Sequence, residues 1–140
     1  MQVNLYRAKG STFIAKGDSN HWVVLDSVKQ FGGSEAASRP MEMVLIALGG
    51  CTALDTESLI NKMRTPVDEF HVEVTAERQD EHPKVFTKIH LTYFFRGNNL
   101  NKANIAKAVK LSQEKYCSVT AMLSKSVDIS YEIKYIGEEN

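Results

Sequence analysis

The sequence has no net charge, no long apolar run and no signal-peptide pattern, and each absence excludes a class of function. Seventeen basic residues balance seventeen acidic ones, so no overall field draws the chain to nucleic acid or anionic lipid. The longest apolar run, residues 43–48, is far too short to span a membrane, and the first ten residues lack the apolar segment of a signal peptide. We therefore expect a cytoplasmic protein that binds neither nucleic acid nor membrane.

Cysteine is scarce as well, with two residues in the chain, Cys51 and Cys117. Lasting disulfides are rare in the cytosol, so two cysteines there indicate free, metal-bound or redox-active thiols rather than a structural disulfide. The chain has no Cys-x-x-Cys pair, and its four histidines show no ligand spacing with either cysteine. The sequence therefore predicts no metal and no bound cofactor.

What is present fits one α+β domain over residues 1–140, a usual size for a single domain. Short strands are predicted at residues 3–6, 12–15 and 22–25. Half-buried antiparallel strands are predicted where apolar and polar residues alternate, at residues 70–76 and 85–95, and a last strand that alternates in the same way is predicted at residues 127–135. Strands in hairpin pairs with helices between them favour an α+β fold with antiparallel sheets, and the tail from residue 137 is expected to be loose.

A long helix is predicted over residues 41–63, with Ser38 as a possible cap. It is apolar on nearly every face as far as residue 54, which is typical of a central buried helix. The Gly49-Gly50 pair inside it indicates a bend or the close approach of another backbone. One half-polar sheet cannot cover such a helix on every side, so we expect a homodimer.

A second helix is predicted to begin at a cap provided by Asn99 or Asn101. Its buried stripe is spaced by four, three and four residues, at Ile105, Val109, Ser112 and Tyr116. A short helix is predicted to follow over residues 119–123.

Cys51 and Cys117 are the candidate chemical residues, and each has a second interpretation. Cys51 lies in mid-helix, gains little from the helix dipole, and would need a cation to become a thiolate. Arg39 and Glu42 are the nearest such pair in sequence, although Cys51 could equally be a small core residue and Glu42 a first-turn carboxylate. Cys117 precedes a helix start, whose free N–H groups stabilise a thiolate, or it is a buried cysteine at a helix corner. An activated thiol and a resolving thiol are the minimum for reducing a peroxide and storing the product as a disulfide.

Two segments, residues 39–52 and 116–120, resemble the OsmC/Ohr family of organic hydroperoxide reductases. The shared pattern is a helix that opens with a proline and a glutamate and ends in small residues and a cysteine, here Gly49-Gly50-Cys51, with a second cysteine far downstream. These motifs are most similar to those of the OsmC-like branch of the family. The resemblance covers essentially the whole chain. It implies an OsmC-like fold and an intertwined homodimer with both cysteines at the subunit interface.

The resemblance also implies roles for individual residues. Cys51 would be the peroxidatic thiolate and Cys117 the resolving thiol, and a dithiol reductant, possibly of the lipoyl type, would restore the pair. Glu42 would hold an arginine against Cys51, with Arg39 and Arg7 as the candidates. The expected function is thus a thiol-dependent peroxidase acting on organic hydroperoxides. The alternatives are a non-catalytic OsmC-like protein that binds an apolar small molecule at the dimer interface, or two purely structural cysteines.

Overall fold

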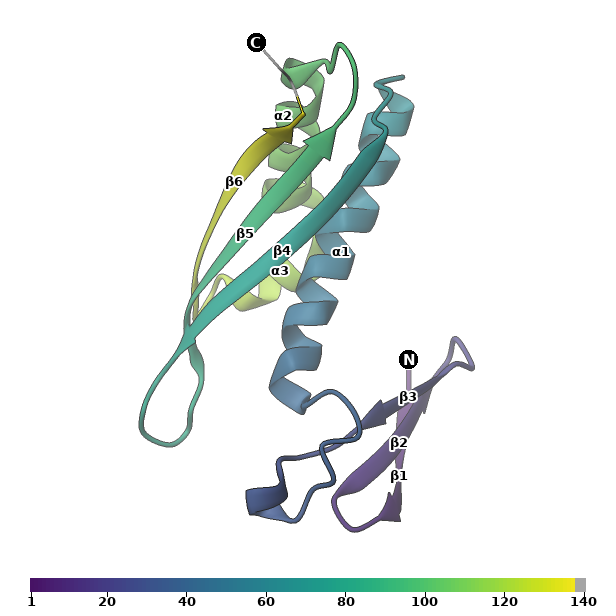
Figure 1. The fold of residues 1–140 in the computed structure, drawn as a ribbon, viewed down its shortest axis with the longest axis vertical. Helices are drawn as coiled ribbons and strands as arrows, with labels where there is room; N and C mark the ends of the chain where they lie inside the picture. Colours follow the sequence, from purple (N-terminus) through teal and green to yellow (C-terminus); the bar gives the residue numbers. More distant parts are fainter. Residues whose placement is uncertain (138–140) are drawn as a thin grey trace. The chain divides into compact units, whose positions relative to one another are not determined.

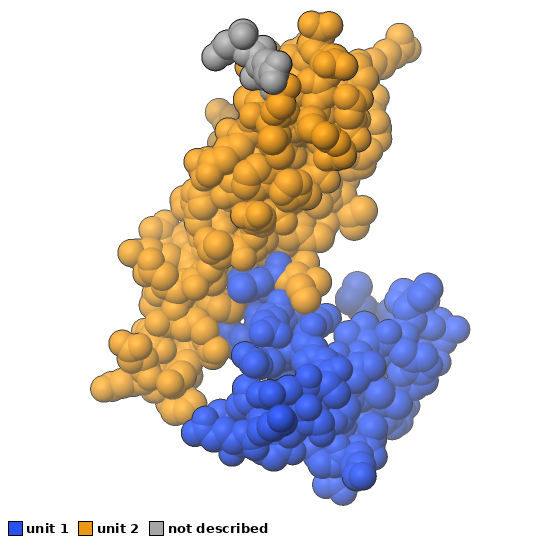
Figure 2. Space-filling view, viewed as in Figure 1, with its two compact units in different colours: residues 1–45 blue, residues 46–140 orange. Residues whose placement is uncertain are grey.

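The computed structural model describes residues 1–137 and divides the chain into two compact units, residues 1–45 and residues 46–140, each described here by itself (Figure 2). The elements are, in chain order, β1 (Val3–Lys9), β2 (Thr12–Gly17), β3 (Trp22–Leu25), η1 (Lys29–Phe31), α1 (Pro40–Lys62), β4 (Glu69–Arg78), β5 (Phe86–Arg96), α2 (Lys102–Leu111), η2 (Ser112–Tyr116), α3 (Ser118–Leu123) and β6 (Asp128–Ile136). The expected loose tail lies, apart from Gly137, outside the described residues. The assignment of the whole chain to one domain stays a prediction.

The first unit is built on an antiparallel meander of β1, β2 and β3. This confirms the three predicted strands, with β1 extended to Lys9. The loop that follows is organised by Asp26, whose carboxylate accepts hydrogen bonds from the backbone N–H groups of Ala36, Ser27 and Ser34. These hydrogen bonds hold the pKa of Asp26 below its ordinary value, and the one from Ala36 has the largest effect. Asp26 therefore fixes the path of the chain towards α1.

The second unit contains a three-stranded sheet in the order β4-β5-β6, with α1 and α2 on one of its faces (Figure 1). The face of β5 that carries Ile89, Leu91, Tyr93 and Phe95 is buried, as the alternation predicts. β4 and β5 are antiparallel, but β5 and β6 are parallel, so the prediction of purely antiparallel sheets is wrong for this pair. The physical reason is the crossover: α2, η2 and α3 carry the chain back to the end of the sheet where β5 began.

Helix α1 matches the predicted helix to within one residue at each end. Its buried residues recur every fourth position and form a single stripe of Leu48, Thr52, Thr56 and Ile60. Gly49 allows the helix to approach β4 closely, because a Cβ there would lie 3.1 Å from Val74 Cγ2. The predicted close approach is thus made to a side chain rather than to a backbone.

The opposite side of α1 is uncovered in the single chain. Ile46 is 54% exposed and Leu54 is 74% exposed, and a Cβ added at Gly50 would meet no atom of the described residues within 4 Å. The prediction of a helix buried on nearly every face is therefore wrong for one chain alone, because one sheet covers only one side of a helix. With a mean hydropathy of 1.5, α1 is also long and apolar enough to qualify as a membrane span. The core helix of a soluble protein passes the same test, and the expected cytoplasmic location stays a prediction.

Helix α2 begins as predicted at Asn101, whose side chain accepts a hydrogen bond from the N–H of Asn104. Val109 and Ser112 lie on the predicted stripe and are buried, but Tyr116 is 47% exposed. The helix widens into the π-helical turn η2 at residues 112–116. This changes the helical phase and turns Tyr116 out of the stripe.

Candidate functional site

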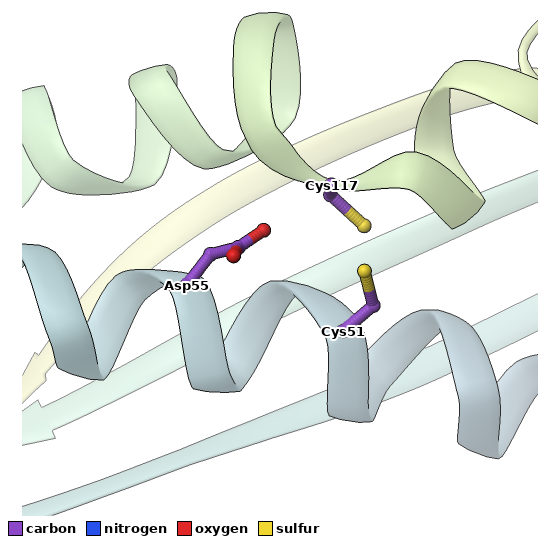
Figure 3. A group of neighbouring side chains, drawn as sticks. All are labelled: Cys51, Asp55 and Cys117. Atoms are coloured by element: carbon purple, nitrogen blue, oxygen red, sulfur yellow. The ribbon is translucent and has the colours of Figure 1, made fainter. Parts of the chain in front are cut away.

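Cys51, Cys117 and Asp55 form a cluster between α1 and the segment that joins η2 to α3 (Figure 3). The two Sγ atoms and a carboxylate oxygen of Asp55 all lie within 4.8 Å of one another. Both cysteines are free thiols, and their side chains point towards each other. The fold therefore brings the two cysteines together, which the sequence left open.

Cys51 and Asp55 share a face of α1 because they are four residues, about one helical turn, apart. The Cys51 thiol is half-buried. One oxygen of Asp55, Oδ2, is buried and has no hydrogen-bond partner in the described part of the chain. The sequence analysis did not single out Asp55, although its spacing of four from Cys51 was a signal that could have found it.

Cys117 lies more deeply, with 2% of its surface exposed. It is the N-cap residue of α3, and its Sγ accepts a hydrogen bond from the backbone N–H of Thr120 at 3.4 Å. This confirms its predicted place at a helix start. Burial raises the pKa of the Cys117 thiol above its ordinary value, and the neighbouring Cys51 adds to the rise, while the hydrogen bonds with Thr120 oppose it. Cys117 is therefore a protonated thiol at neutral pH.

A buried hydrogen-bond network, made by Thr52, Tyr93, Ser112 and Gln113, adjoins the two thiols. The Thr52 hydroxyl lies 2.5 Å from the Tyr93 hydroxyl and 2.8 Å from Ser112 Oγ. Gln113 Nε2 donates to Thr52 Oγ1 at 2.9 Å and to the Tyr93 hydroxyl at 2.6 Å. Burial raises the pKa of Tyr93 to about 12, so its hydroxyl stays protonated. The network joins α1, β5 and η2.

This network sets the position of both thiols through chain neighbours. Thr52 follows Cys51 directly in α1. Ser112 accepts, through its backbone oxygen, a hydrogen bond from the N–H of Cys117 at 2.8 Å. Turns of π-helix frequently occur at functional sites, and η2 delivers Cys117 to the pair. Sequence reasoning found Ser112 as a buried residue but missed its hydrogen bonds, because their partners come from other elements.

Arg39 and Glu42 lie at the start of α1 within the first unit. Arg39 Nη1 is 3.6 Å from Glu42 Oε1, and Glu42 Oε2 accepts a hydrogen bond from the Arg39 backbone N–H at 2.9 Å. Glu42 lies in the first turn, as one interpretation predicts, and it also makes the return half of a capping box. Arg7, the other candidate, lies on β1. The predicted action of either arginine on Cys51 stays a prediction.

The site is thus a pair of thiols in an α+β chain. One thiol lies in the long helix, and it faces a second thiol that caps a short helix. Residues 32–132 match the family model described as OsmC-like protein, and the chain belongs to this family. The sequence resemblance is thereby confirmed at the level of the family.

Two relatives share much of the sequence. Protein YhfA of Escherichia coli (strain K12) is 42% identical over 135 residues, which cover 95% of this chain and 98% of YhfA. The crystal structure of a hypothetical protein from Aquifex aeolicus VF5 has a TM-score of 0.80 and 30% identity, over 97% of both chains. An organic hydroperoxide resistance protein OsmC from Legionella pneumophila has a TM-score of 0.70 over 95% of both chains, and at 15% identity this likeness shows the fold alone.

Proposed function

We propose that this protein is a thiol-dependent peroxidase that reduces organic hydroperoxides through Cys51 and Cys117. Membership of the OsmC-like family and a close pair of cysteines indicate a redox role related to peroxides. The observation that carries the proposal is the pair of free Sγ atoms within 4.8 Å. We take the substrate class from fold relatives named as organic hydroperoxide resistance proteins, such as that of Legionella pneumophila.

The exposure of the two thiols supports their different roles. Cys51 is half-buried and reaches solvent, whereas Cys117 is buried. The Cys51 thiolate attacks the distal peroxide oxygen, the O–O bond breaks, and the departing alkoxide takes up a proton from solvent and leaves as the alcohol. Cys51 is then a sulfenic acid. The Cys117 thiol attacks that sulfur and forms the disulfide, and its proton leaves with the hydroxyl group of the sulfenic acid as water. In this proposal an arginine, Arg39 or Arg7, favours the first thiolate, and Glu42 orients it.

The return to the dithiol needs an external reductant. A dithiol, possibly of the lipoyl type, attacks the disulfide, and its own oxidation to a disulfide supplies the two electrons. The second product is the reduced pair of cysteines.

The proposal predicts that cumene hydroperoxide joins Cys51 to Cys117 in one chain. Intact mass should fall by about 2 Da with loss of both alkylatable thiols, because two hydrogens leave when the disulfide forms. Cys117→Ser should stop at a Cys51 sulfenic acid, which dimedone captures. Two free thiols in wild-type protein after excess peroxide would refute the proposal and leave the small-molecule-binding alternative.

We also propose a homodimer, intertwined as the family resemblance implies, in which a second copy covers the open side of α1. Ile46, Gly50 and Leu54 follow one another at steps of four on that side, and the two large apolar side chains are mostly exposed in one chain.

Leu54→Lys is therefore expected to weaken the dimer by at least ~30-fold, because a charge replaces a central apolar contact. Sedimentation velocity at several protein concentrations measures the change. Lys107→Glu, an exposed change on α2 and so away from the open side of α1, is the control and should leave association intact. A wild-type protein that sediments as a monomer at all concentrations would contradict the dimer.

A further inference from the structure

Asp55 adds a third metal-ligating side chain to the two thiols. We propose that reduced Cys51 and Cys117, together with Asp55, bind one Zn²⁺ ion per protein chain. This inference goes beyond the peroxidase proposal and does not rest on it, because it requires reduced thiols and no peroxide chemistry. It also departs from the sequence prediction of no metal, which considered cysteine and histidine spacing and not a carboxylate one turn from Cys51.

The geometry fits a tetrahedral zinc site with three protein ligands. Bonds of about 2.3 Å to sulfur and about 2.0 Å to oxygen place the ligand atoms of such a site roughly 3.3–3.8 Å apart. The three atoms here are already within 4.8 Å of one another. Figure 3 shows all three side chains directed into the same space between α1 and the segment before α3. Small side-chain rotations are sufficient to close the site around an ion.

The charge of the cluster favours a cation. Asp55 Oδ2 is buried and accepts no hydrogen bond from any described residue, and a buried carboxylate oxygen needs a donor, a proton or a cation. Among the described residues 46–137, none forms an ion pair with Asp55. Two thiolates and one carboxylate would carry three negative charges in a partly buried space. A bound Zn²⁺ offsets two of them.

The ligand types select zinc over the common hard cations. Mg²⁺ and Ca²⁺ are bound by sets of oxygen atoms, whereas thiolates suit Zn²⁺. The N–H of Thr120 that donates to Cys117 Sγ would orient this ligand, as outer hydrogen bonds do in zinc proteins. Three protein ligands leave the fourth position for water or another small ligand.

The zinc site and the disulfide exclude each other, because both use the same two sulfur atoms. Oxidation of Cys51 and Cys117 to a disulfide removes two of the three ligands and releases the ion. A peroxide, ROOH, supplies the oxidising equivalents: the two zinc-bound thiolates, ROOH and two protons give the disulfide, ROH, water and free Zn²⁺. Metal occupancy would thus depend on the redox state of the pair.

The test uses reduced full-length protein without peroxide, with Co²⁺ as a spectroscopic probe and Zn²⁺ measured by competition with a chromophoric chelator. We expect one ion per chain and sulfur-to-cobalt charge-transfer absorption, which reports thiolate ligands. Asp55→Ala should weaken Zn²⁺ binding by more than about 10- to 100-fold, the range found when only an outer hydrogen-bond partner of a metal ligand is removed. Cys51→Ser should lower the charge-transfer absorption by about half or more, because one of the two thiolate ligands is lost. Glu57→Gln, an exposed change on the same helix, should bind as wild type does.

Equal Zn²⁺ affinity in wild type and Asp55→Ala would overturn the site, as would the absence of charge-transfer absorption. Asp55→Asn keeps the shape of the side chain and serves if Asp55→Ala does not fold. A second measurement uses wild type alone: protein whose thiols have been oxidised to the disulfide should no longer bind Zn²⁺, and unchanged binding overturns the proposal. The peroxide experiment on Cys51 and Cys117 is run with a metal chelator, so the failure of one proposal leaves the other intact.

Discussion

Cys51→Ser is expected to lower kcat/KM for cumene hydroperoxide by about 1,000-fold or more, because loss of a nucleophile removes the reacting atom itself. Cys117→Ser should behave differently. It retains the attacking sulfur and should consume about one equivalent of peroxide rapidly, after which turnover stalls because no second thiol resolves the sulfenic acid. Stopped-flow measurement of peroxide consumption, with and without a dithiol reductant, separates the two variants.

The control for this comparison is Met122→Leu. Met122 is exposed on α3, and an exposed thioether also reduces peroxide, although without turnover. This variant should keep the wild-type rate. Equal steady-state rates for wild type and Cys51→Ser would contradict the assignment of Cys51 as the attacking thiol. A burst in Cys51→Ser that is lost in Cys117→Ser would reverse the two roles.

Thr52→Val is expected to lower the free energy of unfolding by about 2–4 kcal/mol, because the buried groups that lose a partner pay a desolvation cost of about 1–3 kcal/mol each. Its hydroxyl contacts the Tyr93 hydroxyl, Ser112 Oγ and Gln113 Nε2. Urea unfolding of the reduced protein measures the change. The same variant should also slow peroxide-driven disulfide formation, because the network sets the position of η2 and hence of Cys117.

Thr56→Val is the matched control, and the structure makes the comparison unusually close. Thr56 is as fully buried as Thr52 and lies one turn further along α1, but its hydroxyl has no hydrogen-bond partner in the described part of the chain. Replacing an unpaired hydroxyl by a methyl group should leave stability unchanged or raise it by about 1 kcal/mol. An equal loss of unfolding free energy in the two variants would mean that side-chain shape in this buried stripe determines stability and the hydrogen-bond network does not.

Helix α1 and strand β5 were predictable because their signals are local. Apolar residues on nearly every face as far as residue 54 identified the helix, and alternation along residues 85–95 identified the face of the strand that carries Leu91 and Phe95. The helix start at Cys117 was predictable in the same way. Each of these features depends on residues within one or two turns, or within one strand.

The rest of the site depends on contacts between distant segments. The parallel pairing of β5 with β6 follows from how the crossover packs, and alternation reads the same in parallel and antiparallel strands. The π-helical turn η2 has no local sequence signal. The hydrogen-bond partners of Thr52 come from β5 and η2, which are distant in sequence. Asp55 lies one helical turn from Cys51, a local signal, but its position beside both thiols depends on the approach of Cys117.

The parallel pair of β5 and β6 also has a consequence for synthesis of the protein. β6 follows β5 by more than thirty residues, so one edge of β5 lacks its partner until residues 128–136 have been made. A strand with an apolar face and a free edge is a template for pairing with other chains, and long-range parallel pairs form slowly. Nascent chains, or chains truncated before β6, would therefore expose this edge of β5. Pairing of β6 covers the edge and so protects the chain against aggregation.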